Sequence, residues 1–277
     1  MNITLIGIGA LGSVIAKRLS SRWDITVIDR DFVEENNLIS QPIYDVHDIG
    51  KTKVDALLSK LPVKGKMLDV SKDTIGEIGT PDLLICATDT FESKFLINDY
   101  CKKYKISAIY ASAAGNRAMI LSVKDAPCFS CIFKMSNDDC ETSGIDYGTT
   151  VKVADVVAEE IANITSKTYV PSLIYVAGSE SEKIKVGSNS RCAVCKGDYF
   201  HLDKSPRMSF RLCGGAYILH EKFDFEKLHF PQMKKFNNVI HYNGVTFFSD
   251  GRIFVRAKTE EDAKRKVISL IQTQSHF

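Results

Sequence analysis

Residues 2–13 of the chain read NITLIGIGALGS. The apolar run at residues 2–6 is typical of a buried strand, and the pattern G-x-G-x-x-G follows it directly on Gly7, Gly9 and Gly12. In such a turn the first glycine permits the tight bend, the second lets the backbone approach a phosphate, and the third lets helix and strand pack closely. The stretch therefore predicts a Rossmann-like nucleotide-binding unit, with a merely structural tight turn as the alternative.

Segments with strand and helix patterns alternate after this turn. A second strand, residues 25–29, ends in Asp29, the acid expected to hold a ribose hydroxyl, and a third, residues 82–88, is followed by Asp89. Further strand patterns lie within residues 107–123. This alternation predicts an α/β doubly wound sheet, in which ligands bind in the crevice at the carboxyl ends of the strands. Both acids should face that crevice.

The composition is that of an ordinary globular enzyme or binding protein. The chain has 277 residues, is 44% apolar and 25% charged, and carries a net charge of +2. Such a balance argues against a protein that coats nucleic acid or lies on a membrane surface. There is no apolar run of transmembrane length, and the chain begins with a strand pattern rather than a secretory leader. We therefore expect a cytoplasmic protein with neither nucleic acid nor membrane as partner.

Four of the eight cysteines form two C-x-x-C pairs, Cys128 with Cys131 and Cys192 with Cys195. In a reducing compartment such pairs are more often metal ligands than disulfides, and Zn²⁺ prefers four thiolates at the corners of a tetrahedron. The long interval between the pairs predicts a structural zinc site that pins a later part of the chain onto an earlier loop. Redox-active dithiols are the alternative.

The last part of the chain has a different character. Residues 196–209 are rich in charge and are typical of a linker, and Asn243-Gly244 and Asp250-Gly251 are hairpin signals between apolar runs. With a final helical pattern at residues 260–271, this part predicts a small α+β module. The expected division is a domain of residues 1–204 and a module of residues 205–277.

Taken in order, the motifs of residues 1 to 200 resemble the ThiF/MoeB/HesA superfamily of adenylating enzymes, which are relatives of the ubiquitin-activating enzymes. The motifs are GIGALG at residues 7–12, Asp29 and Asp31 followed by NLISQ at 37–41, GKTK at 50–53, CATD at 86–89, PCFSC at 127–131, CETSG at 140–144, and the closing CAVC at 192–195.

The resemblance implies a Mg-ATP enzyme that joins AMP to the C-terminal carboxylate of a small ubiquitin-like or sulfur-carrier protein ending in Gly-Gly, and it implies a homodimer. Asp29 would bind the ribose, with Asp31 beside it in the cofactor site. Asn37 and Lys53 would contact the triphosphate, and Asp89 would hold Mg²⁺. The three glycines of the turn would lie along the phosphates. The chemistry needs no general base, because the attacking carboxylate is already ionised.

Cys140 matches the position at which some relatives place a reactive cysteine. It would attack the adenylate to give a thioester, or take part in sulfur transfer. The alternative is a loop thiol without a role, because some family members adenylate without this cysteine.

Two departures from the family pattern favour a second hypothesis. Ser40 stands where the pattern N-x-x-R-Q has an arginine, and the chain begins at its first strand, without the N-terminal helix that supplies an arginine in many relatives. A catalytically weakened member that acts as a carrier-binding or scaffold module is the alternative function. A nicotinamide-dependent oxidoreductase ranks last, since it leaves Lys53, Asp89 and both cysteine pairs unexplained.

Overall fold

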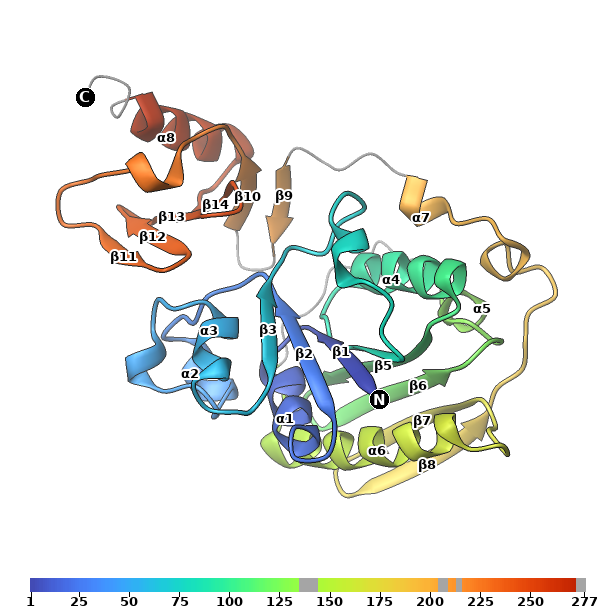
Figure 1. Ribbon diagram of the computed structural model, residues 1–277. Coiled ribbons are helices and arrows are strands. Elements are labelled where there is room, and N and C mark those ends of the chain that lie inside the picture. The colour runs from blue at the N-terminus through green and yellow to red at the C-terminus, as the bar shows by residue number, and fades with distance from the viewer. Residues whose placement is uncertain (135–143, 204–208, 213–215, 273–277) are drawn as a thin grey trace. The chain divides into compact units, whose positions relative to one another are not determined.

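The computed structural model describes residues 1–134, 144–203, 209–212 and 216–272 (Figure 1). Its contacts divide the chain into two compact units. The first contains residues 1–49 and 53–205, and the second contains residues 50–52 and 206–277.

The first unit is built on a sheet of eight strands within the described residues, in the order β3-β2-β1-β4-β5-β6-β7-β8. The strands from β3 to β5 in that order run parallel, and β5 to β8 pair antiparallel. The predicted doubly wound α/β sheet is therefore confirmed and carries an antiparallel extension. The strands are β1 (Asn2–Ile6), β2 (Asp24–Asp29), β3 (Lys64–Met67), β4 (Leu83–Cys86), β5 (Ser107–Ala114), β6 (Arg117–Val123), β7 (Ser172–Ala177) and β8 (Glu180–Lys185).

Helices cover both faces of this sheet (Figure 1). On one face α1 and α6 pack over Leu5 and Val27, and on the other α4 packs over Leu84. Successive residues of a strand point to opposite faces, so apolar strands such as β1 and β4 contribute to both cores. The helices are α1 (Ala10–Leu19), α2 (Asn37–Ser40), α3 (Lys53–Leu58), α4 (Phe91–Tyr104), α5 (Phe129–Ile132), α6 (Tyr147–Thr165) and α7 (Phe200–Asp203), with 3₁₀ turns η1 (Val46–Asp48), η2 (Ile75–Ile78) and η3 (Val194–Lys196).

The second unit has an antiparallel sheet in the order β11-β12-β13-β14-β10-β9. Helix α8 contributes Val267 to a core that also contains Phe247 and Val255. Asn243 and Gly244 both have positive φ angles, 49° and 68°, as the predicted two-residue hairpin requires. The elements are β9 (Ser209–Leu212), β10 (Ala216–His220), η4 (Phe225–Lys227), β11 (Lys234–Phe236), β12 (Val239–Tyr242), β13 (Val245–Phe248), β14 (Arg252–Arg256) and α8 (Glu260–Gln272).

Two elements differ from the sequence expectations. Strand β3 has the sequence KGKM, which lacks an apolar pattern because the strand lies at the edge of the sheet with its residues exposed or half-buried. The expected linker at residues 196–209 contains α7, whose His201 backbone N–H donates to the buried Asp99 carboxylate at 2.7 Å. A contact across 102 positions leaves no local pattern in the sequence.

No helix among the described residues is both long enough and apolar enough to cross a membrane.

Candidate functional site

The glycine-rich turn joins β1 to α1 at the carboxyl edge of the large sheet. Gly7 has a φ of +87°, and a Cβ added there would lie 2.9 Å from the Ala87 carbonyl oxygen. A Cβ on Gly12 would lie 1.8 Å from the Gly7 carbonyl oxygen. A Cβ on Gly9, in contrast, would meet nothing within 4 Å. The fold itself thus requires Gly7 and Gly12, whereas Gly9 leaves open space beside a helix start that has no side-chain cap.

Asp29, at the end of β2, supports this turn from inside. Its carboxylate accepts the backbone N–H of Ile8 at 2.7 Å and that of Asp31 at 2.8 Å, and the residue is only 8% exposed. Burial raises the pKa of Asp29, although the nearby Lys53 cation opposes that effect. The Tyr44 hydroxyl adds a second support, since it donates to the Ile8 carbonyl at 2.8 Å. Asp29 therefore fixes the shape of the turn, and its contact with a ribose stays a prediction.

Lys53 begins α3 and is almost completely buried, at 6% exposure. Its ammonium lies 3.3 Å from the Asp31 carboxylate, and its backbone N–H donates to the Asp31 carbonyl at 2.9 Å. Burial acts to lower the pKa of Lys53, but the Asp31 and Asp29 carboxylates raise it above the ordinary value. The structure thus holds a charged lysine beside the glycine-rich turn, where a polyphosphate would need one.

Asp89 follows β4, the strand next to β1, and reaches the same carboxyl edge. Its charge is among those that raise the pKa of Lys53 and of Arg30. Sequence reasoning overlooked Lys94, which is 3% exposed in the first turn of α4 and donates to the Thr88 carbonyl, next to Asp89. The sequence signal for Lys94 is its position near a helix start, where a positive charge opposes the helix dipole.

Asn37 and Cys140 are not brought into this cluster by any described contact. The Asn37 side-chain oxygen accepts the Glu34 backbone N–H at 3.0 Å, which closes a local turn at the start of α2. Cys140 lies outside the described residues. The roles proposed for both residues stay predictions.

The four cysteines of the two C-x-x-C pairs come together at α5 and η3. Their sulfurs all lie within 4.8 Å of one another, with 3.6 Å between Cys128 and Cys192 and 3.5 Å between Cys131 and Cys195. Zn–S bonds of about 2.3 Å place the corners of a tetrahedron roughly 3.8 Å apart. The donor set and its spacing therefore fit a zinc ion. Asn98 of α4 supports the site by accepting the Phe129 N–H at 2.9 Å.

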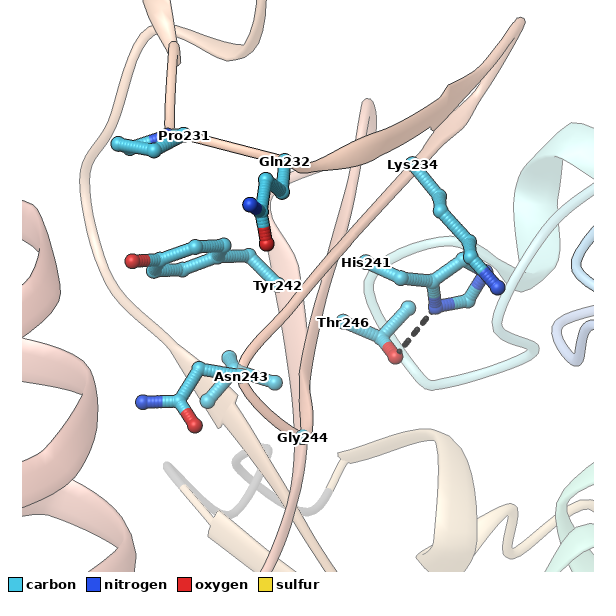
Figure 2. A pocket seen from close by; sticks show the side chains of 9 residues that line it. Pro231, Gln232, Lys234, His241, Tyr242, Asn243, Gly244 and Thr246 are labelled. Carbon is cyan, nitrogen blue, oxygen red and sulfur yellow. Dashed lines mark hydrogen bonds between the residues drawn. The ribbon is translucent and has the colours of Figure 1, made fainter.

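A hollow of about 700 Å³ lies on the second unit, around the β12–β13 hairpin (Figure 2). Tyr242 and Asn243 line it, and His241 Nδ1 is 2.9 Å from the Thr246 hydroxyl. Burial lowers the pKa of His241. The hollow contains none of the residues that the sequence marks as catalytic or ligand-binding.

The profile of the ThiF family matches residues 1–192, from the first strand to the first cysteine of the second pair. The chain belongs to the ThiF family. The ThiF match covers the glycine-rich turn, Lys53 and Asp89, and it leaves most of the second unit outside. The resemblance found in the sequence is therefore confirmed.

Curated relatives of this ThiF protein are similar at modest identity. The sulfur carrier protein ThiS adenylyltransferase of Bacillus subtilis is 28% identical over 54% of this chain and 50% of its own length. The SAMP-activating enzyme E1 of Haloferax volcanii is 26% identical over 52% of this chain and 59% of its own. The sulfur carrier protein adenylyltransferase of Thermus thermophilus is 26% identical over 70% of this chain and 82% of its own length. The matched part thus spans about half the length of the first two relatives.

Two solved structures share the fold of the chain. Escherichia coli MccB with succinimide superposes with a TM-score of 0.60 at 18% identity, covering 70% of this chain and 65% of that one. The structure of PaaA superposes with a TM-score of 0.52 at 19% identity, covering 67% of this chain and 64% of that one.

Proposed function

We propose that this protein is an ATP-dependent adenylyltransferase that activates the C-terminal carboxylate of a small ubiquitin-like or sulfur-carrier protein. Membership of the ThiF family and the adenylyltransferase names of several relatives support this proposal. The observation that carries it is the arrangement at one sheet edge, where an open glycine-rich turn lies beside the buried, charged Lys53 and near Asp89.

The proposed reaction is an in-line displacement at the α-phosphorus of ATP. The carrier carboxylate forms the new P–O bond, the bond between the α-phosphorus and the bridging oxygen breaks, and its electron pair leaves with pyrophosphate. The backbone amides at the start of α1 would hold the phosphates, and Lys53 would offset the charge that grows on their oxygens. Asp89 would hold Mg²⁺, which supplies further charge neutralisation when bound. No proton is transferred, so these residues need no histidine among them.

The cysteine cluster has a structural role in this proposal. A site closed by four thiolates leaves no position for a substrate, so zinc at Cys128, Cys131, Cys192 and Cys195 would hold the chain rather than react. We also propose a cytoplasmic location, where free thiols stay reduced.

The remaining details of the proposal concern partners and organisation. We take residues 1–204 as the adenylation domain and residues 205–277 as an appended module, and we propose a homodimer and a carrier that ends in Gly-Gly. After adenylation, the Cys140 thiolate would attack the carbonyl carbon of the acyl-adenylate, so that a thioester C–S bond forms, the C–O bond to the phosphate breaks and AMP leaves.

ATP–pyrophosphate exchange, measured with Mg²⁺ and candidate carriers ending in Gly-Gly, tests the proposal. We expect carrier-dependent exchange that Asp89→Ala abolishes, while Asp125→Ala, a change at an exposed loop acid, retains it. If no carrier supports exchange, and Asp89→Ala binds ATP as tightly as the wild type, the proposal is wrong.

Ser40 favours a second candidate, a carrier-binding module with little turnover. Guanidinium contacts to a polyphosphate stabilise a transition state by several kcal/mol, so the missing arginine can reduce the rate by about 10²–10⁴. Under this hypothesis Ser40→Arg raises the exchange rate by a comparable factor. A wild-type rate similar to that of Ser40→Arg would contradict it.

A further inference from the structure

Arg30, directly after Asp29, is a cation of the site that the adenylation chemistry leaves without a role. Its Nη1 lies 3.1 Å from the Asp69 carboxylate, and its Nε lies 3.7 Å from the Asp31 carboxylate. Asp31 follows β2, whereas Asp69 follows β3, so acids on two different connections hold one guanidinium. The Arg30 side chain keeps 28% of its surface exposed, while that of Asp69 keeps 14%.

These two ion pairs determine how the guanidinium can be used. The Nη1 hydrogen bond to Asp69 and the nearby Asp31 carboxylate hold the guanidinium at its edge, and a guanidinium held at its edge can stack through its flat faces. Burial acts to lower the pKa of Arg30, but Asp69 and then Asp31 raise it, so the group stays charged. Asp89, beyond β1, has the weakest effect of the charges that act on Arg30. The 3.1 Å contact with Asp69 thus directs the Arg30 guanidinium toward the end of β3.

The order of the strands places Arg30 relative to a nucleotide. The proposed phosphate-binding turn follows β1, and Asp29, the proposed ribose ligand, ends the neighbouring β2. In a nucleotide the base is attached to the ribose on the side away from the phosphates. The next position along the edge is the end of β3, where Asp69 holds the Arg30 guanidinium. The base of a bound nucleotide would thus reach the face of Arg30.

We propose that Arg30 is a stacking platform for the purine base and a specificity-determining residue of this site. Asp69 is its positioning residue. A charged guanidinium is attracted to the face of an aromatic ring, and the larger face of a purine gains more from the contact than that of a pyrimidine. This inference rests on the proposed ATP-binding role of the same edge.

A matched pair of double variants tests the platform. Arg30→Tyr with Asp69→Asn keeps a flat aromatic face, whereas Arg30→Leu with Asp69→Asn removes it, and both lack the cation and the unpaired acid. Affinities for adenosine, ATP and inorganic tripolyphosphate would be measured by titration calorimetry. We expect the leucine variant to bind adenosine and ATP about 5–30-fold more weakly, and the tyrosine variant to stay within about threefold of wild type. Tripolyphosphate affinity should be the same in both variants.

Several results would overturn the platform. The proposal is wrong if the leucine variant binds adenosine as tightly as the wild type, or if the tyrosine and leucine variants lose adenosine affinity equally. It is also wrong if the wild-type protein binds no adenosine. Loss of ATP and tripolyphosphate affinity in both variants, with adenosine binding unchanged, would place Arg30 at the phosphates instead. Arg22→Leu, at an exposed position, and the thermal midpoint of each variant control for folding.

The same measurements separate this inference from the adenylation proposal. Absence of exchange with every carrier, together with the expected adenosine affinities, would remove the adenylation reaction and keep the platform. Carrier-dependent exchange together with equal adenosine affinities in all variants would remove the platform alone.

Discussion

Alanine at Gly9 and alanine at Gly12 should separate nucleotide binding from folding within one turn. A Cβ at Gly12 would lie 1.8 Å from the Gly7 carbonyl oxygen, which is backbone and cannot move aside without shifting the turn. Overpacking of this kind typically costs about 1–3 kcal/mol, and a backbone clash this short belongs at or above the upper end. A Cβ at Gly9 would meet nothing within 4 Å, so the added methyl has room at this position.

Gly9→Ala should therefore be destabilised less than Gly12→Ala, since its cost is about 1 kcal/mol at the helix N-cap rather than a backbone clash. The added methyl occupies the space through which a phosphate approaches the amides. Loss of one or two charge-assisted hydrogen bonds, each worth about 1.5–3 kcal/mol, weakens ATP binding by roughly 10- to 100-fold or more.

Denaturant unfolding and calorimetric ATP titration would be carried out on both variants. Gly12→Ala is expected to lose stability, and Gly9→Ala to lose ATP affinity with a clearly smaller loss of stability. The reasoning fails if Gly9→Ala binds ATP as wild type does, or if it is destabilised as strongly as Gly12→Ala.

Three further predictions concern Tyr44, the cysteine cluster and Asp99. Tyr44→Phe removes the hydroxyl that donates to the Ile8 carbonyl, and we expect a loss of about 1 kcal/mol in urea unfolding; an unchanged midpoint would contradict a bond at that site. Purified protein should contain one zinc per chain by elemental analysis, and Cys192→Ser should lose it along with thermal stability; a metal-free wild type of full stability would refute the zinc site. The pKa of Asp99 is raised from 3.8 to about 6 by burial, so the folded state binds the extra proton and stability falls as pH rises through that interval. Asp99→Asn should flatten this dependence in unfolding curves between pH 4 and pH 7, and a variant that keeps the wild-type slope would show that Asp99 is not its source.

The sequence predicted those parts of the site that consist of short motifs with fixed spacing. The glycine-rich turn and the C-x-x-C pairs each combine residue type with a fixed interval, and the structure forms both the turn and the cysteine cluster. Tyr44 and Asp69 were not predicted, because their partners, Ile8 and Arg30, are more than thirty positions away along the chain and only the fold brings them together. Periodicity cannot reveal such pairs.

Asp29 shows a subtler difference between pattern and structure. The motif identifies the acid at the end of β2, but it does not reveal that both carboxylate oxygens accept backbone amides of the adjoining connections. An acid that a motif marks for a ligand also holds the protein in shape, and only the hydrogen bonds of the fold show this.

The cysteine cluster has a consequence for how this protein family can vary. Cys128 and Cys192 are 64 positions apart, so joining them closes a large ring of chain. The entropic cost of closing a ring grows only with the logarithm of its length, and doubling the length adds only about 0.6 kcal/mol. Insertions and deletions in the loops between the two cysteine pairs should therefore change the free energy of folding little, provided that α6 and β7 keep their places. The loops of this stretch can thus change in length while the connection between its ends stays constant.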